Sequence, residues 1–299
     1  MIGTTPRQAI DSVVRSVCGH EVERLVRLTS GGLNETYRVE LAGAGSIIAR
    51  IARQPMPWFT DEAHIMAQAR AVGVPTAEVL GVEHVEHDGE LLSFSIQQML
   101  AGRSLDEVAG ELSAVDLERL VMDGGELLAR VHSLAPDRGV RHELQPPDEH
   151  SLARGERIVE QTLGLSAASV VGRGAAFLHR EMAARPAPSR VLVHGDWMPK
   201  HFLIDGGAIV GIIDWELAGS ASPAFDFAMW EVSAGDGLHD RSDLLRLGYA
   251  RVADPDAADG GWGPAFAVAR ALEVLGWPDP AWPERIRRCV DVIARYADA

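Results

Sequence analysis

The stretch that decides the fold reads Val-Leu-Val-His-Gly-Asp-Trp-Met-Pro-Lys-His-Phe-Leu-Ile at residues 191–204, followed by Gly-Ile-Ile-Asp-Trp-Glu at 211–216. A short apolar run ends in His-Gly-Asp, which predicts a buried strand that delivers Asp196 onto the loop after it. His201 opens a second apolar run, and an Asp-Gly-Gly turn predicts a hairpin with a third run, which ends in Asp214. Two carboxylates and an imidazole are therefore expected where three short strands end.

These side chains predict chemistry at a hydroxyl or a phosphate. One carboxylate can accept the proton of an attacking hydroxyl, while the other carboxylate and the imidazole hold a divalent cation. Other interpretations stay open. His194, Asp196, His201 and Asp214 could form the di-metal centre of a phosphoesterase-type hydrolase, or the chain could bind a nucleotide without turning it over. His201 could also be a core histidine that bonds a neighbour.

The flanking sequence predicts a β-rich segment followed by a larger helical one, an α/β (α+β) fold. Short apolar or alternating runs predict a small antiparallel sheet with one helix. The strands are expected at 25–28, 36–41, 46–51, 79–84 and 91–99, and the helix at 61–72. Past residues 101–104 the apolar spacing becomes helical, at 105–131 and again at 151–184. The sequence therefore predicts an N-terminal lobe over 1–98 and a C-terminal lobe over 99–299.

Composition and charge exclude several classes of protein. The chain has 299 residues, of which 46% are hydrophobic and 24% charged, as in a globular protein of about two domains. Its net charge of −15, from 43 acids and 28 bases, disfavours binding to a nucleic-acid backbone. The chain has two cysteines, Cys18 and Cys289, at its opposite ends. Two cysteines make neither a disulfide framework nor, at this spacing, a C-x-x-C zinc motif, which predicts a cytoplasmic protein. The first residues lack a secretory signal, and no apolar run approaches the length of a membrane span.

The order and spacing of these motifs resemble the aminoglycoside phosphotransferases, which are relatives of the protein kinases. That family shows His-Gly-Asp, an asparagine five residues after the aspartate, a hairpin, Ile-Asp-Trp or Ile-Asp-Phe, and then Asp-Pro-x-x-Asp. This chain has His194-Gly195-Asp196, His201, Ile213-Asp214-Trp215 and Ser222-Pro223-Ala224-Phe225-Asp226 in the same order.

The resemblance continues upstream and covers about residues 28–232. The segments that carry it are Gly31-Gly32-Leu33-Asn34 for the loop that covers the nucleotide, Asp61-Glu62-Ala63 and Val74-Pro75 for a helix and the next strand, and Met99-Leu100-Ala101-Gly102 for the hinge. The resemblance implies a bilobal protein-kinase-like fold and transfer of the γ-phosphoryl group of ATP or GTP, with Mg²⁺, to a hydroxyl of a small molecule. It implies no nucleic-acid or membrane partner, and it leaves the oligomeric state open.

The resemblance assigns roles residue by residue. It implies that Asp196 positions or deprotonates the acceptor hydroxyl, that His201 and Asp214 hold the metal, and that His194 and Asp226 brace the loop. The residues implied to bind the nucleotide are Gly31, Gly32 and Asn34 in the covering loop, Arg50 at the phosphates with Glu62 as its ion-pair partner, and the backbone of Gln98 and Leu100 at the adenine edge.

Two positions depart from the family pattern. Arg50 stands where a lysine is usual, and the 28 bases comprise 27 arginines and the single Lys200. An arginine still offers a fixed charge and forked donors to phosphate. His201 stands where an asparagine is usual. The macrolide kinases, which belong to the same family, also have a histidine at this position.

The family resemblance makes an antibiotic the expected acceptor. An aminoglycoside or a related antibiotic, inactivated by phosphorylation, is expected first, and a macrolide or another small metabolite is the alternative. If the acceptor is cationic, Glu216, Glu231 and Asp236 are candidates to line its cleft.

Overall fold

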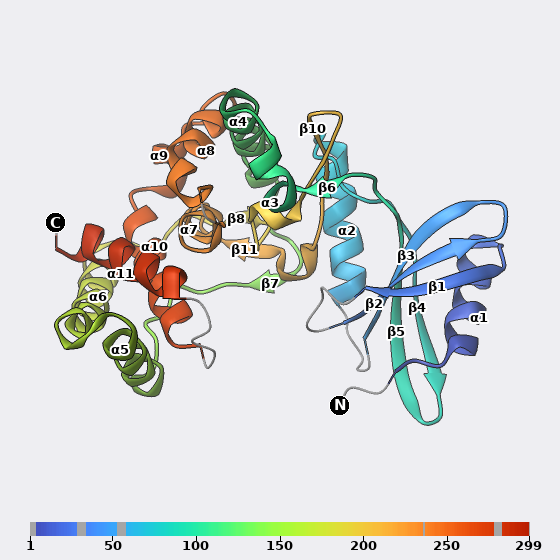
Figure 1. The fold of residues 1–299 in the computed structure, drawn as a ribbon, viewed down its shortest axis with the longest axis horizontal. Coiled ribbons are helices and arrows are strands. Elements are labelled where there is room, and N and C mark those ends of the chain that lie inside the picture. The colour runs from blue at the N-terminus through green and yellow to red at the C-terminus, as the bar shows by residue number, and fades with distance from the viewer. Residues whose placement is uncertain (1–3, 29–33, 53–57, 236, 278–282, 299) are drawn as a thin grey trace. The chain divides into compact units, whose positions relative to one another are not determined.

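The computed structural model describes residues 4–28, 34–52, 58–235, 237–277 and 283–298. Its contacts divide the chain into two compact units (Figure 1). The first unit holds residues 1–103 and 203–216, and the second holds residues 104–202 and 217–299. Residues 203–216, which the sequence analysis placed in the C-terminal lobe, thus group with the N-terminal sheet. Each unit is described by itself below.

The first unit is built on a five-stranded antiparallel sheet with strand order β1-β2-β3-β5-β4. Buried and partly exposed residues alternate along β2, because one face of that strand packs on the core. The strands are β1 (Val22–Leu28), β2 (Glu35–Leu41), β3 (Gly45–Ala52), β4 (Val79–His87) and β5 (Glu90–Gln98). All five predicted strands are present, with ends that differ by a few residues.

Two helices accompany this sheet. Helix α1 (Arg7–Cys18) buries Ile10 and Val14 in the same hydrophobic core as the strands, and no helix was predicted there. Helix α2 (Trp58–Ala71) corresponds to the predicted helix at 61–72 and buries Glu62.

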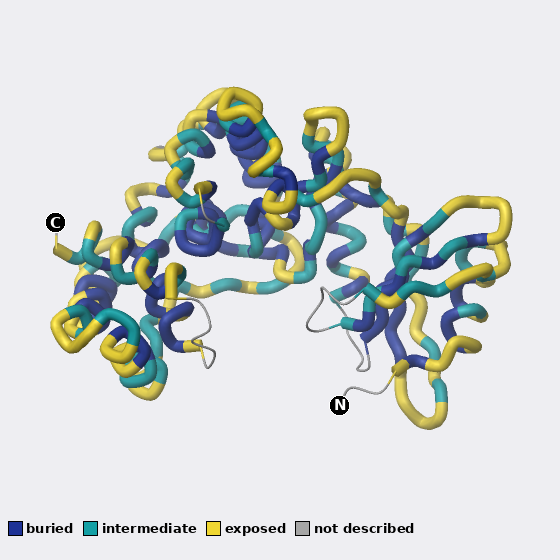
Figure 2. Tube along the Cα trace, viewed as in Figure 1, coloured by how far each residue is buried: buried dark blue, intermediate teal, exposed yellow. Residues whose placement is uncertain are grey.

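The hairpin of β9 (Phe202–Asp205) and β10 (Ala208–Ile212) joins the short β6 (Arg103–Ser104) in a second sheet of order β10-β9-β6. A backbone hydrogen bond of 2.7 Å from Ile212 N to Pro75 O ties the hairpin to the segment after α2. This contact is within the first unit and explains why the hairpin groups with it. The turns from β4 to β5 and from β9 to β10 are exposed (Figure 2).

The second unit is mostly helical. It also contains a small sheet of order β7-β11-β8, formed by β7 (Val140–Arg141), β11 (Gly219–Ala221) and β8 (Val191–Val193). Its helices are α3 (Leu105–Val108), α4 (Ala114–His132), α5 (Glu149–Leu163), α6 (Leu165–Ala184), α7 (Ala224–Ser233), α8 (Ser242–Tyr249), α9 (Pro255–Asp259), α10 (Gly263–Leu275) and α11 (Pro283–Ala297). Among the described residues, no helix is both long enough and apolar enough to span a membrane.

Local capping explains where two predicted helices divide. Ser113 is the N-cap of α4, because its side chain accepts a hydrogen bond from the backbone N–H of Asp116. A new helix therefore begins there, and the helix expected at 105–131 is divided into α3 and α4. Gly164, at φ +97°, separates α5 from α6 within the expected helix at 151–184.

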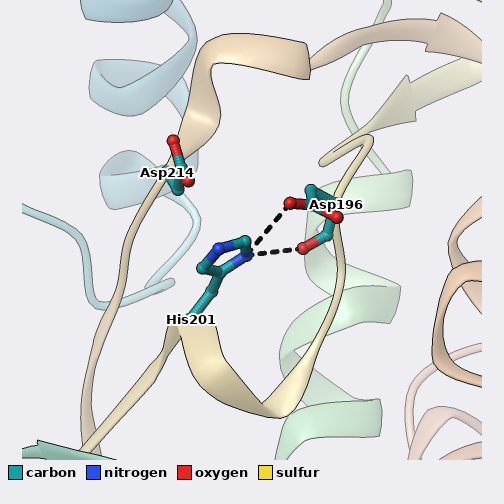
Figure 3. Close-up of side chains that lie close together, drawn as sticks. All are labelled: Asp196, His201 and Asp214. Atoms are coloured by element: carbon teal, nitrogen blue, oxygen red, sulfur yellow. Dashed lines mark hydrogen bonds and ion pairs between the residues drawn. The ribbon is translucent and has the colours of Figure 1, made fainter. Parts of the chain in front are cut away.

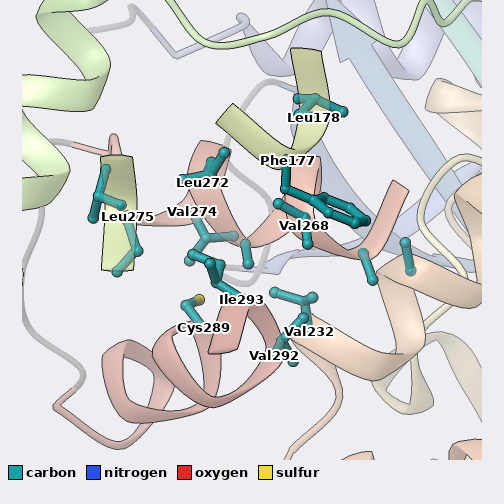
Figure 4. Close-up of a cluster of buried hydrophobic side chains, with 14 of the residues drawn as sticks. Phe177, Leu178, Val232, Val268, Leu272, Val274, Leu275, Cys289, Val292 and Ile293 are labelled. Atoms are coloured by element: carbon teal, nitrogen blue, oxygen red, sulfur yellow. The ribbon is translucent and has the colours of Figure 1, made fainter. Parts of the chain in front are cut away.

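The core of the second unit lies around α10 (Figure 4). Val268 and Leu272 of α10 are buried with Leu178 of α6, Val232 of α7 and Ile293 of α11. Burial of each such side chain contributes about 1.5–3 kcal/mol. This packing fixes α7 and α11, which carry residues of the site described next.

Candidate active site

The loop after β8 carries the His-Gly-Asp motif. Gly195 adopts φ +85°, and a Cβ placed there would lie 2.2 Å from the backbone oxygen of Leu217. Only glycine combines that backbone conformation with so close an approach. A single 3₁₀ turn at Pro199–His201 then presents Lys200 and His201. The sequence of the loop therefore dictates its tight path.

Asp226, the first-turn acid of α7, anchors this loop. Its carboxylate is fully buried and accepts hydrogen bonds from the backbone N–H groups of His194 (2.8 Å) and Gly195 (2.9 Å). Burial alone would raise the pKa of Asp226, but hydrogen bonds and the neighbouring histidines hold it below its ordinary value. Asp226 thus braces the loop as a carboxylate, the arrangement that the family resemblance implied.

The sequence analysis missed a third partner of Asp226. Nε2 of His132, at the end of α4, lies 3.1 Å from the Asp226 carboxylate and donates to it, and Nδ1 lies 3.3 Å from the hydroxyl of Tyr249. Burial raises the pKa of Tyr249 to about 12, so its phenol stays protonated and can donate to Nδ1. Helical spacing was the one sequence signal that could have predicted the burial of His132. His132 follows buried Leu128 by one turn and so lies on the apolar side of α4.

Asp196 is the half-buried carboxylate that the loop presents. Its Oδ2 lies 3.5 Å from Nζ of Lys200 and 3.7 Å from Nδ1 of His201. Nδ1 of His201 donates to the backbone oxygen of Asp196 over 2.8 Å (Figure 3). That hydrogen bond places the proton of a neutral imidazole on Nδ1 and the lone pair on Nε2, which is the form that ligates metals.

A second group of charges lies within the first unit, around Arg50. Arg50 donates from Nη1 to Glu62 Oε1 and from Nη2 to Glu216 Oε2, the latter over 2.7 Å. Asn34 Nδ2 donates to the same Glu216 oxygen over 2.8 Å, and Asp214 Oδ1 lies 3.7 Å from Arg50 Nη2. Arg50 and Glu62 are buried, so the expected pair exists as an interior ion pair.

Negative charges outnumber positive charges in the group around Arg50. Burial alone would lower the pKa of Arg50, but Glu62, Asp214 and Glu216 together raise it. Burial raises the pKa of Glu62, partly opposed by Arg50. Three carboxylates therefore surround one guanidinium, and when all are ionised the group carries an excess of two negative charges. Oxygen donors with that excess charge suit a divalent cation such as Mg²⁺.

Asp214 also has an unusual backbone. It adopts φ +67°, the left-handed region in which aspartate is tolerated better than most residues. Such conformations concentrate at functional sites, where the surrounding structure enforces them. Asp214 belongs to the first unit, and Asp196 and His201 belong to the second.

Gln98 is the last residue of β5, and Leu100, the other residue expected to meet the adenine, lies two residues beyond it. The backbone N–H of Gln98 donates to Glu78 O over 2.8 Å. The adenine contact expected of Gln98 would thus use its carbonyl rather than its N–H, while Leu100 could contribute its own N–H.

The remaining predicted residues divide into two sets. Gly31, Gly32 and Asp236 lie outside the described residues. Glu231, expected in a cleft for a cationic substrate, is mostly buried and accepts hydrogen bonds from Arg295 (2.9 Å) and the Tyr296 hydroxyl (3.0 Å). It lines a cavity of about 530 Å³. Other residues that line this cavity are His239, Asp240, Asp243, Arg288 and Asp291.

The fold and the braced His-Gly-Asp loop define a kinase-like phosphotransferase. The chain belongs to the phosphotransferase enzyme family APH, whose family model matches residues 24–260. This confirms the expected family, and the kinase-like fold with a β-rich N-terminal part and a helical C-terminal part is likewise confirmed.

Solved structures share the fold at low sequence identity. An apo thermostable mutant of aminoglycoside phosphotransferase APH(4)-Ia superposes with a TM-score of 0.66 at 17% identity, covering 95% of this chain and 98% of that one. A putative fructosamine-3-kinase from Thermobifida fusca YX-ER1 superposes with a TM-score of 0.62 at 18% identity, covering 98% of this chain and all of that one.

Among curated proteins, the uncharacterized protein YcbJ of Bacillus subtilis (strain 168) is 44% identical over 46 residues. That match spans 15% of each chain, so this chain covers well under two thirds of that relative.

Proposed function

We propose that this protein is an ATP-dependent O-phosphotransferase that phosphorylates a hydroxyl of a small molecule. The observation that carries the proposal is the loop on which Asp196 is presented, fixed by the two backbone hydrogen bonds to buried Asp226. A positioned carboxylate can orient an acceptor hydroxyl and take its proton as the phosphoryl group transfers. Because that transition state is loose, the protein contributes mainly positioning and charge neutralisation.

The first unit supplies the groups proposed for the nucleotide. Arg50, oriented by Glu62, would place its guanidinium on the phosphates, and Asn34 with its glycine neighbours would cover them. The backbone of Gln98 and Leu100 would meet the purine. A phosphoesterase-type hydrolase has no use for these groups, and the buried Arg50–Glu62 pair therefore favours the kinase.

The donor set fits Mg²⁺. We assign the metal to Asp214 and His201, with the excess negative charge around Arg50 as support. When bound, Mg²⁺ would neutralise charge on the nucleotide phosphates. His201 brings a nitrogen where magnesium prefers oxygen, so the site would also accept manganese.

The structural neighbours indicate how wide the range of acceptors is. Mutants of APH(4)-Ia were solved as ternary complexes with hygromycin B and ADP or AMP-PNP, and another neighbour is described as a putative fructosamine-3-kinase. Aminoglycosides and related antibiotics are thus the first acceptors to test, with resistance by inactivation as their consequence. Macrolides and hydroxylated metabolites follow. We place the reaction in the cytoplasm, where ATP is available.

A coupled assay of ADP release with MgATP, run against a panel of hydroxylated compounds, tests the proposal. Asp196→Ala should lower the rate by about 10²–10⁴ and leave nucleotide affinity nearly unchanged. Asp205→Ala, at the exposed end of β9, is the matched control and should keep the wild-type rate. Near-normal turnover by Asp196→Ala, or phosphate release from phosphomonoesters without a nucleotide, would contradict it.

A further inference from the structure

Asp196 and Lys200 are the two residues of the loop 194–201 that reach solvent. The structure describes every residue of this loop, and the other six are buried. The side chains of Asp196 and Lys200 are 15% and 51% exposed, and Nζ of Lys200 lies 3.5 Å from Oδ2 of Asp196. The loop therefore presents one carboxylate and one ammonium side by side, and a group that reaches Asp196 from solvent also meets Lys200.

The turn that carries Lys200 is fixed by its neighbours. Pro199 and His201, on either side of Lys200, are buried, and Nδ1 of His201 donates to the backbone oxygen of Asp196 over 2.8 Å. Helix α3 packs against the same turn. The backbone is thus held in place while the flexible four-carbon stem of Lys200 can move its ammonium between Asp196 and a second anion.

Charges of both signs surround this ammonium. Partial desolvation raises the pKa of Asp106 on α3, and the nearby charges of His201 and Lys200 oppose that rise. Arg285 of α11 lies within electrostatic range of Asp196. Two carboxylates, those of Asp106 and Asp196, therefore act on Lys200, and both would repel an anionic phosphoryl group that comes to Asp196. Lys200 is placed to offset that repulsion.

Lys200 is also the single lysine among the 28 basic residues of the chain, and the other 27 are arginines. The two side chains differ in how they meet an anion. An ammonium is compact and rotates its three donors freely, whereas a guanidinium is planar and holds its donors in a fixed fork. An ammonium can therefore bond a carboxylate and a phosphoryl oxygen at once, in directions that a planar fork does not offer.

We propose that Lys200 is a catalytic residue that binds the phosphoryl group while it transfers to the acceptor hydroxyl at Asp196. The inference rests on the proposed function and adds a residue to its reaction. In that reaction the acceptor oxygen bonds the γ-phosphorus, and the hydroxyl proton passes to Asp196. The bond from the γ-phosphorus to the β–γ bridging oxygen breaks, and ADP leaves with the electron pair. The ammonium of Lys200 stays intact and neutralises charge on the phosphoryl oxygens.

Substitutions of Lys200 separate a catalytic charge from a surface ion pair. Lys200→Met keeps the reach of the side chain and removes its charge. With the best acceptor of the panel, it should lower kcat about 10²-fold and change the Kd for MgATP less than about twofold. Lys200→Arg keeps the charge and should retain more activity than Lys200→Met. Arg119→Gln is the matched control, because Arg119 is 43% exposed and pairs with Asp123 at the same i,i+4 spacing, and it should keep the wild-type kcat.

A labelling experiment locates the amine without measuring turnover. In γ-acetyl ATP, the acetyl group is attached to an oxygen of the γ-phosphate, so an unprotonated amine beside that phosphate attacks the acetyl carbonyl. An amide bond forms, the bond from the carbonyl carbon to the phosphate oxygen breaks, ATP leaves with the electron pair, and the amine proton passes to solvent. Peptide mapping of the wild-type protein should find the amide at Lys200, and excess ATP should prevent its formation. Acetyl phosphate, which lacks the nucleoside, should give far less of it.

The possible results separate the two proposals. A wild-type kcat in Lys200→Met would show a surface ion pair of the kind that contributes little, and overturns the role of Lys200. Absence of the amide in a protein that binds MgATP also overturns that role, as does equal labelling by acetyl phosphate, which would show an exposed amine only. Each of these results leaves the kinase proposal standing. Absence of MgATP binding in the wild-type protein overturns the proposed function itself.

Discussion

His132 donates a hydrogen bond from Nε2 to the buried carboxylate of Asp226 over 3.1 Å, and the two residues are 94 positions apart. The same carboxylate fixes the backbone of His194 and Gly195. Helix α4 thereby orients the loop of the His-Gly-Asp motif through one side chain, although it contributes no group to the proposed chemistry. His132 is a positioning residue, and its removal should affect both stability and turnover.

His132→Ala should lower the free energy of unfolding by about 1–3 kcal/mol, because a buried carboxylate loses a hydrogen-bond donor. It should also lower kcat more than it changes KM, because the loop that presents Asp196 loosens. His132→Gln, which can still donate, should recover part of both losses. Urea unfolding and steady-state kinetics measure the two effects. A normal kcat in a destabilised His132→Ala protein would show that the contact is structural only.

Asp226 should also contribute to the acid sensitivity of the fold. Its pKa is lowered in the folded protein from an ordinary value of 3.8, mainly by His132, against the opposing effect of burial. Such a carboxylate adds stability above its unfolded pKa, and the contribution is lost as the pH falls through the folded pKa. The stability difference between wild type and Asp226→Asn should therefore stay constant from about pH 8 to 5 and shrink only below about pH 4. A difference that shrinks already between pH 7 and 5 would contradict the lowered pKa.

Arg50 should have separable roles in stability and in nucleotide binding. Arg50→Ala leaves Glu62 buried without its charge partner and should cost about 3–5 kcal/mol of stability. Adding Glu62→Gln removes the buried charge and should restore most of that stability. The double variant should still bind ATP at least about tenfold more weakly than wild type, because the phosphates have lost their guanidinium. Restored nucleotide affinity in the double variant would remove Arg50 from the phosphate site.

Asp214→Ala should abolish the gain in nucleotide affinity that magnesium provides. Magnesium is commonly held by one or two carboxylates together with phosphate oxygens. The loss of one carboxylate therefore removes half or all of the carboxylate ligands that the protein supplies. Calorimetric titrations of ADP with and without Mg²⁺ measure the gain directly. The exposed Asp205→Ala variant should retain it in full. If Asp214→Ala retains it as well, the proposed metal assignment is wrong.

His201→Asn should stay active with magnesium and lose relative activity with manganese. The substitution exchanges an imidazole nitrogen for an amide oxygen, which is the harder ligand that magnesium prefers. The ratio of turnover with manganese to turnover with magnesium, measured for both proteins, is the readout. An unchanged ratio would show that His201 serves only its hydrogen bond to the Asp196 backbone.

The sequence by itself determined the local elements and the family. Alternating apolar residues specify β2, the apolar run before His194 specifies β8, and Gly195 allows the tight turn that presents Asp196. These features depend on neighbours in the chain, and so the motifs could be placed on the correct strands and loops. The pairing of Arg50 with Glu62 followed from the family resemblance, which carries tertiary information that spacing alone lacks.

Only the tertiary structure decided which distant side chains meet. From the sequence, His132 is one more residue on an apolar helix face. Its contact with Asp226 exists because the end of α4 lies beside the first turn of α7, where the His132 ring also lies 6.3 Å from that of Phe227. Glu216, a candidate substrate contact from the sequence, accepts from Arg50 and Asn34, because residues 203–216 fold with the first unit. Asp106 comes within electrostatic range of Lys200, beside Asp196, because α3 packs against the turn at Pro199–His201, and the net charge of −15 does not show this. Composition averages charge over the whole chain, whereas a ligand responds to the few charges that packing brings within ångströms of it.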